Sequence, residues 1–151
     1  MKYVFKITIC AMTALIVMSG CFVDLVRQEN KEALLESSKQ WYVYKILYQN
    51  GREFTPIWEQ AKSSMSFDVD ENRIFGVSVC NNYFATFALS GKKLKVSNSG
   101  SSRRICFPHE SAEYEYYFLK ALEGDFIVRK KGNQMQLEGK EATYYLKLIE
   151  D

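Results

Sequence analysis

Histidine is almost missing from this sequence, because His109 is the only one in 151 residues. A serine or cysteine hydrolase needs a histidine beside its nucleophile and an acid that orients it, and no Gly-x-Ser-x-Gly sequence is present. Cys106 and His109 stand at a ligand-like spacing and Cys80 would add a third donor, but zinc usually takes four ligands at fixed local spacing. We therefore expect no catalytic residue, no metal and no cofactor.

A strong net charge is also lacking. The chain has 20 Lys and Arg against 18 Asp and Glu, and Lys2 and Lys6 are the only charged residues among the first twenty. The rest of the chain therefore has 18 of each sign. Binding to nucleic acid requires a clustered basic face, so we expect no nucleic-acid partner. The overall charge also predicts no strong attraction to anionic lipid.

No apolar run is long enough to span a membrane. Ile7–Met18 has twelve residues, which would extend about 18 Å as a helix against a hydrocarbon core of about 30 Å. Lys2 and Lys6 precede the run, and Ser19-Gly20 follows it. This order of basic, apolar and small residues is typical of a secretory signal, which we predict over residues 1–20.

The end of that segment resembles a bacterial lipobox. Met18-Ser19-Gly20-Cys21 has an aliphatic residue, two small residues and then cysteine, so Cys21 is the expected site of lipidation; a free or paired cysteine is the alternative. Acyl chains such as palmitate would anchor the protein to a membrane. The residue after the cysteine is Phe22 and not the aspartate that resembles an inner-membrane retention signal, so we expect the periplasmic face of the outer membrane. Residues 21–40 then form the lipidated cysteine and a polar tether, either helical or flexible.

Two cysteines remain after this assignment. Cys10 lies in the signal segment and Cys21 is assigned to the lipid, which leaves Cys80 and Cys106 in an oxidising compartment. We predict that they form a structural disulfide. A redox-active pair is the alternative, although the chain has no Cys-x-x-Cys sequence.

Residues 41–151 have the pattern of one small β-rich domain that opens at Trp41. Apolar and polar residues alternate in Met65–Val69, and turn pairs such as Asn50-Gly51 separate successive runs of this kind. Residues Ser97–Ser102 are expected to form a polar loop. The predicted fold class is α+β and mainly β: a highly curved antiparallel sheet or small barrel of about eight strands, with one helix packed on it.

The one predicted helix covers Glu110–Leu122, with a proline before it and a glycine after it. Glu115 shares the apolar face of this helix with Phe118. Because a buried carboxylate must be paired or neutral, we expect an ion pair from Glu115 to Arg103; contact with a ligand is the alternative.

The asparagines after Cys80 and the clustered tyrosines are further candidates for a structural or a binding role. Asn81 and its neighbour Asn82 lie in a predicted turn, where asparagine side chains bond to their own backbone. The tyrosines, clustered on the helix and on the last strand, are expected to pack the sheet or to line a binding cleft.

Four motifs, in chain order, resemble the META domain family of bacterial envelope proteins, also called HslJ-like. They are Trp41, Gly76-Val77-Ser78-Val79-Cys80-Asn81-Asn82-Tyr83-Phe84, Ser101-Ser102-Arg103-Arg104-Ile105-Cys106 and Glu115-Tyr116-Tyr117-Phe118-Leu119-Lys120-Ala121-Leu122. The motif positions singled out are Trp41, Gly76, Asn81, Tyr83, Arg103, Glu115 and Phe118. Val79 replaces the family's glycine before the cysteine.

The resemblance implies a compact β-rich fold with a helix across it and a link to envelope stress and drug tolerance, without catalytic residues. We expect a non-enzymatic, lipid-anchored envelope protein that acts by interaction. The alternatives are a periplasmic carrier of a lipid or small hydrophobic ligand, and a pilotin-like or adhesin-like module that contacts another protein. A cavity large enough for an acyl chain would favour the carrier, whereas a filled interior would favour contact.

Overall fold

The structure, a computed structural model, describes residues 23, 25–37, 39–57 and 63–149. The predicted signal segment and Cys21 lie outside these residues. The chain divides into two units, Met1–Leu34 and Leu35–Asp151. In the first unit residues 25–34 are helical. Nowhere in the described ranges does a helix combine the length and the apolar character needed to cross a bilayer.

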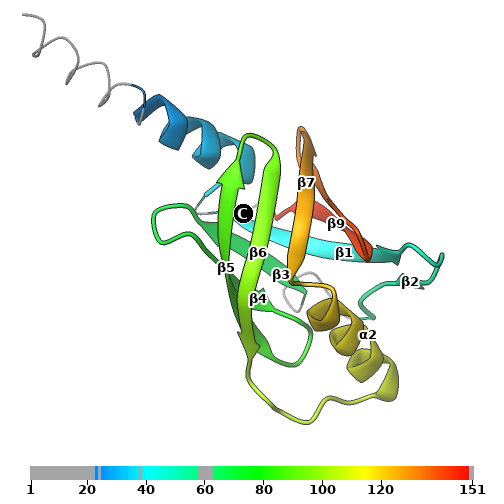
Figure 1. Cartoon of the computed structure of the whole chain (residues 1–151). Coiled ribbons are helices and arrows are strands. Elements are labelled where there is room, and N and C mark those ends of the chain that lie inside the picture. The colour runs from blue at the N-terminus through cyan, green and yellow to red at the C-terminus, as the bar shows by residue number, and fades with distance from the viewer. Residues whose placement is uncertain (1–22, 24, 38, 58–62, 150–151) are drawn as a thin grey trace, which may run out of the picture. The chain divides into compact units, whose positions relative to one another are not determined.

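The second unit is a closed antiparallel β-barrel of eight strands, with one additional strand and the helix α2 (Figure 1). β1 pairs with both β3 and β9, and this double pairing closes the ring. The predicted fold class is therefore confirmed. The barrel strands are β1 (Gln40–Tyr48), β3 (Ser64–Asp68), β4 (Arg73–Val77), β5 (Asn82–Ser90), β6 (Lys93–Ser101), β7 (Gly124–Lys131), β8 (Gln134–Gly139) and β9 (Ala142–Leu148). The additional strand β2 (Glu53–Phe54) pairs with the last part of β1, beyond the residues that pair with β3, and α2 covers His109–Lys120.

Alternation of buried and exposed residues along the strands gives the barrel its interior. In β5 every second residue, beginning with Tyr83 and ending with Leu89, is buried and the others are exposed. Successive side chains of a strand point to opposite faces, so one face of each strand lines the interior. The interior is filled by large side chains that are each at most 1% exposed: Trp41, Ile46, Met65, Phe67, Ile74, Phe118, Met135, Tyr144 and Leu146.

Strand β6 is longer than the sequence predicted. Residues Ser97–Ser101, expected in a loop, continue the strand because they pair with β5, with Gly100 opposite Phe84 and Ser101 opposite Tyr83. The register shifts between Phe84 and Thr86, and Asn98 has a φ of 53°. A bulge of this kind accommodates small polar residues in a strand and increases its twist. The prediction of a loop here was wrong because composition alone does not show this pairing.

The two ends of the barrel follow from the strand directions. β1, β4, β6 and β8 start at the end where the chain enters the barrel at Gln40, which we call the entry end. The other four barrel strands start at the opposite end. Helix α2 connects the end of β6 to the start of β7, so it lies at this opposite end, the helix end (Figure 1). Phe118 closes the interior there, with ring centroids 5.0 Å from Tyr83 and 5.4 Å from Tyr144.

Candidate functional site

The predicted disulfide between Cys80 and Cys106 is confirmed, with Cα atoms 5.6 Å apart. Cys80 lies in the tight turn between β4 and β5, where the Ser78 amide donates to the Asn81 carbonyl at 2.8 Å. Cys106 lies in the segment between β6 and α2. The bridge therefore ties two connections at the helix end of the barrel to each other.

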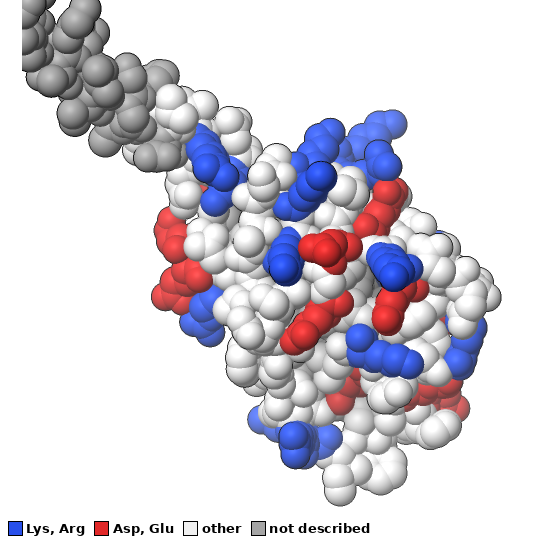
Figure 2. All heavy atoms as spheres, in the orientation of Figure 1, with Lys and Arg blue, Asp and Glu red and all other residues white. Residues whose placement is uncertain are grey.

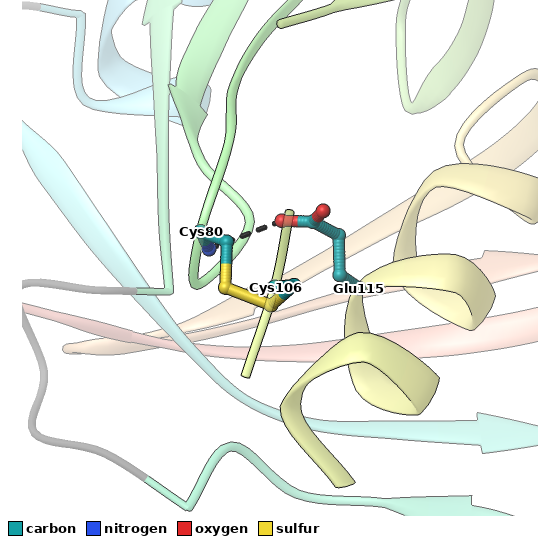
Figure 3. Close-up of side chains that lie close together, drawn as sticks. All are labelled: Cys80, Cys106 and Glu115. Carbon is teal, nitrogen blue, oxygen red and sulfur yellow. Dashed lines mark hydrogen bonds between the residues drawn. A yellow bond between two sulfur atoms is a disulfide. The ribbon is translucent and has the colours of Figure 1, made fainter. Parts of the chain in front are cut away.

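The Glu115 carboxylate reaches from α2 into the same turn (Figure 3). Its Oε2 accepts hydrogen bonds from Ser78 Oγ at 3.1 Å, the Cys80 amide at 3.0 Å and the Asn81 amide at 2.9 Å. The side chain is only 8% exposed. Successive backbone amides that converge on one oxygen form a concave site for an anion. The turn therefore supplies the polar partners that a buried carboxylate requires.

The ion pair predicted between Glu115 and Arg103 is not formed. Arg103 is exposed, and the hydrogen bonds to Glu115 come from the turn instead. Asn81 completes the set, because its Nδ2 donates to Glu115 Oε1 at 2.5 Å. Donors of the turn therefore hydrogen-bond to the Glu115 carboxylate in place of the Arg103 guanidinium group that we expected.

Asn81 has a wider role than the local turn bonding we expected. Its Oδ1 accepts from the Arg104 amide at 2.7 Å and from Ser102 Oγ at 2.8 Å, and its Nδ2 also donates to the Arg104 carbonyl at 3.2 Å. The residue is 3% exposed. One side chain therefore joins the turn, the segment after β6 and, through Glu115, helix α2.

Val79 is the position at which this turn departs from the family pattern. Its φ is 81°, in the left-handed region that favours glycine and is costly for a β-branched residue. The resemblance places a glycine at this position. The disulfide at Cys80 and the hydrogen bonds of the turn to the Glu115 carboxylate hold the residues that follow Val79 and stabilise this conformation.

The sulfur and carboxylate donors that could form a metal site already have partners. The sulfur atoms of Cys80 and Cys106 and a Glu115 oxygen lie within 4.8 Å of one another, but the sulfurs are bonded to each other and the carboxylate accepts hydrogen bonds from the turn. A thiolate, rather than a disulfide, is the sulfur ligand or nucleophile. His109 is exposed at the first position of α2. The oxidised arrangement is thus a structural centre that fixes the loops.

Gly76 and Tyr83 form the adjoining part of the core. A Cβ atom at Gly76 would lie 2.1 Å from the Ser64 carbonyl oxygen, so only glycine fits there. The Tyr83 hydroxyl donates to the same carbonyl at 2.9 Å, and burial raises the pKa of this phenol well above its usual value. These two motif positions therefore bring β3, β4 and β5 into close contact.

The tyrosines divide between the core and the surface. Tyr114 and Tyr144 are buried, and their hydroxyls bond to Ser63 Oγ at 2.6 Å and to the Phe118 carbonyl at 2.6 Å. Tyr116 is 58% exposed. Tyr114 and Tyr144 therefore pack the core, whereas Tyr116 lies on the surface.

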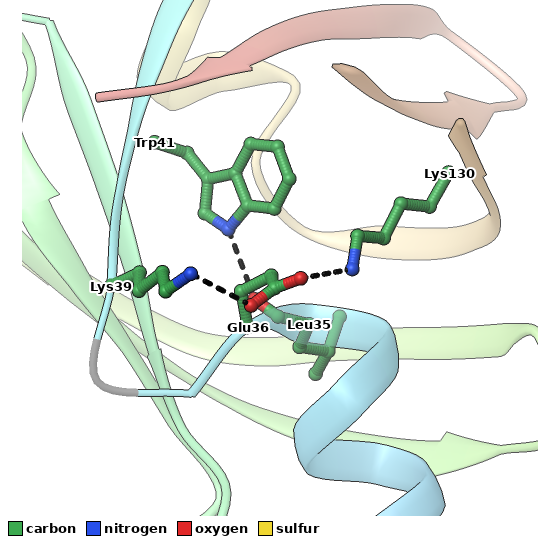
Figure 4. A network of polar contacts seen from close by, with 5 residues as sticks. All are labelled: Leu35, Glu36, Lys39, Trp41 and Lys130. Atoms are coloured by element: carbon green, nitrogen blue, oxygen red, sulfur yellow. Dashed lines mark hydrogen bonds and ion pairs between the residues drawn. The ribbon is translucent and has the colours of Figure 1, made fainter. Parts of the chain in front are cut away.

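A second polar network lies at the entry end (Figure 4). The Trp41 indole donates to the Leu35 carbonyl at 2.9 Å, and Leu35 is fully buried. Glu36 pairs with Lys130 of β7 and, at 3.4 Å, with Lys39. The compact unit therefore starts at Leu35, ahead of Trp41, where we had placed the start of the domain. The short apolar stripe around Leu35 was the only signal of this in the sequence.

Replacing Glu36 with glutamine should make stability less dependent on pH. The hydrogen bond from Lys130 holds the pKa of Glu36 below its usual value. The pair therefore stabilises the fold above the unfolded pKa near 4.5, and this contribution disappears as pH falls through the folded value. We expect Glu36→Gln to reduce the free energy of unfolding by up to about 1 kcal/mol at pH 7 and to match the wild type near pH 3. Urea unfolding at several pH values measures this.

The control is Glu71→Gln, which removes an exposed ion pair with Arg73. Exposed pairs contribute little, so this variant should behave like the wild type throughout. A loss in Glu36→Gln that persists at low pH would show that the ion pairs are not its cause.

Known structures and families complete this description. A family model for the META domain matches residues 33–150. An NMR structure of a protein from Burkholderia xenovorans superposes with a TM-score of 0.62 and 21% identity, over 81% of this chain and 89% of that one. A second NMR structure gives 0.54 and 22%, over 73% and 88%. No curated protein matches. The structural likenesses agree in fold, and the family match covers nearly the whole second unit, so this chain belongs to the META domain family.

Proposed function

We propose that this protein is a non-enzymatic, lipid-anchored component of the bacterial cell envelope that acts by contact with another envelope component. Membership of the META family supports an envelope or stress-related role. The lipobox-like sequence ending at Cys21 supports the anchor, and the Cys80–Cys106 disulfide is compatible with an oxidising compartment. The periplasmic face of the outer membrane is the proposed location.

One observation carries the choice of contact over transport: the barrel interior is filled. Trp41, Phe118 and Tyr144 occupy it and are each 0% exposed. A carrier needs an apolar cavity that encloses most of its ligand, so an acyl chain would have to displace these side chains. A surface cavity of about 320 Å³ near Lys39 and Asp68 has a polar lining, which suits an acyl chain poorly. Contact through the outer surface is therefore the favoured mode.

The anchor is tested by replacing Cys21 with serine in the full chain. We expect Cys21→Ser to abolish labelling with radioactive palmitate and to release the protein from washed membranes, because the acylated thiol is gone. Cys10→Ser is the matched control, since Cys10 lies within the predicted signal and should be dispensable for labelling. Globomycin should cause the precursor to accumulate. Palmitate incorporation into Cys21→Ser would contradict the proposed anchor.

The mode of action needs a separate experiment. The protein is purified from its own envelope and measured by native mass spectrometry. We expect no lipid inside the barrel, and a partner protein, where one is retained, bound at a fixed stoichiometry. A stoichiometric lipid that survives removal of the N-terminal anchor would favour the carrier instead.

A further inference from the structure

The segment between β6 and α2 carries the most exposed large apolar side chains in the described part of the chain. Ile105 is 83% exposed and Phe107 is 79% exposed, although both flank the disulfide-bonded Cys106. Two arginines, Arg103 and Arg104, come just before them. We call residues 103–107 the Arg-Ile-Phe loop. Burying apolar groups is favourable, so this exposure stands in need of an explanation.

The backbone of this loop is held in place. The disulfide fixes Cys106, the Asn81 side chain bonds to both the amide and the carbonyl of Arg104, and the Ser102 amide donates to the Asn82 carbonyl at 2.9 Å. A rigid loop that presents apolar side chains loses little conformational entropy when they are buried in a partner. The exposed groups are therefore presented in advance of binding.

The loop is also the end of a basic stretch. From Asn72 to His109 the sequence has six Lys and Arg residues and no Asp or Glu. Arg73, Lys92, Lys93 and Lys95 lie toward the entry end, so Arg103 and Arg104 are the cations of this loop. Neither Arg103 nor Arg104 forms an ion pair among the described residues. Figure 2 shows basic side chains next to uncharged surface at the lower end of the view, where Figure 1 places the connection from β6 to α2. The chain is neutral overall after its first twenty residues, and of the acids in the first turns of α2, Glu113 is paired with Arg52. The loop therefore presents two exposed arginines beside its apolar side chains.

We infer that the Arg-Ile-Phe loop binds the surface of an anionic lipid bilayer. Ile105 and Phe107 enter the layer between headgroups and acyl chains, and the two arginines bind lipid phosphates, which match guanidinium geometry. The apolar side chains protrude outward, and a bilayer accepts a protruding group without a preformed pocket. A protein partner would need a matching acidic and apolar pocket.

The position of the loop separates it from the residue where the chain enters the barrel. It lies at the helix end, opposite the entry end where the chain arrives from the proposed lipid anchor. A single weak membrane signal gives marginal binding, and basic residues near an anionic surface strengthen it. The inference rests on the envelope location proposed above, but not on lipidation itself.

The test uses the unit of residues 35–151, which has its own closed sheet, core and disulfide. Its fold matches a solved chain over 89% of that chain's length, so the fold stands without a further domain. Binding is measured by co-sedimentation with vesicles of three parts phosphatidylcholine to one part phosphatidylglycerol, and with phosphatidylcholine alone. We expect binding to the anionic vesicles to be clearly stronger and to weaken as salt is raised.

Two variants separate the charges from the apolar groups. Arg103→Gln with Arg104→Gln should weaken binding to the anionic vesicles by about thirtyfold, the effect expected of two basic residues near such a surface. Ile105→Ser with Phe107→Ser should weaken it by on the order of tenfold or more. All variants keep the disulfide and are compared with the wild type by thermal unfolding.

The matched controls place the same changes elsewhere on the barrel. Lys92→Gln with Lys93→Gln removes two exposed charges at the entry end, and Phe75→Ser removes a ring that is 45% exposed on the barrel wall. Both should bind like the wild type. Equal binding to both vesicle types, or equal losses in the controls, would overturn the inference. Because Cys21 is absent from this unit, either outcome is independent of the palmitate experiment.

Discussion

Glu115→Ala should lower the free energy of unfolding by about 4 kcal/mol, the largest effect we expect from a single substitution that leaves the disulfide intact. The carboxylate is the common acceptor for Ser78, Cys80 and Asn81 at the helix end of the barrel. Hydrogen bonds to a charged group contribute about 1.5–3 kcal/mol each, and a buried donor left without a partner costs about 1–3 kcal/mol. Water that enters beside the half-buried Cys80 offsets part of this loss.

Urea unfolding under oxidising conditions measures this change. Glu113→Ala is the matched control, because it alters the same helix but removes only an exposed ion pair with Arg52; its effect should stay below about 1 kcal/mol. Glu115→Gln should fall between the two, since its amide keeps one acceptor oxygen but points a donor at the turn. A Glu115→Ala protein as stable as Glu113→Ala would mean that the turn does not depend on the carboxylate.

The origin of this effect marks where prediction from sequence ended. The alternation of Met65–Val69 and the turn signals predicted the β-rich fold. The assignment of the other two cysteines left Cys80 and Cys106 to form the disulfide. These features are local or follow from counting, so composition and period are enough to find them. The partner of Glu115 depends on backbone amides whose direction is set by the turn at Val79. No pattern of side-chain charges reveals such donors.

The entry end shows the same limit in another form. Glu36 and Lys130 are far apart in the sequence and meet only because the end of β7 comes close to the residue that follows Leu35. The charged segment before Trp41 contains several acids, and nothing in the sequence distinguishes Glu36 from the others, which are expected to be solvated in a tether. Long-range pairing between single charges requires the closed barrel to be known first.

The net charge of the chain gave no indication of the exposed Arg-Ile-Phe loop. Overall neutrality predicts no strong attraction to anionic lipid, and it does not show that the acids and bases are separated along the chain, with none of the acids between Asn72 and His109. The fold places the consecutive residues Arg103 and Arg104 at the helix end, away from Lys92 and Lys93 where β6 begins. A net charge therefore describes solubility, whereas a binding surface depends on how the charges are distributed.

Replacing both Cys80 and Cys106 with serine should lower the free energy of unfolding by roughly 3.5 kcal/mol, the loss expected from opening a loop of 26 residues. The reduced wild type should unfold at the same urea concentration as the double variant, which is the internal control. Both are measured against the oxidised protein. If reduction leaves the unfolding midpoint unchanged, the bridge does not constrain the chain.

The disulfide and Glu115 should not act independently, because both hold the turn that contains Val79. Contacts that share a structural element show coupling of about 0.5–3 kcal/mol. Additive losses would total about 7.5 kcal/mol, within the range of about 5–15 kcal/mol for a whole domain. We therefore expect Glu115→Ala to cost less in the reduced protein than in the oxidised one, since an unlinked turn has already lost part of its alignment with the carboxylate. A cost that is equal in the two states would show instead that the disulfide and the helix fix the turn separately.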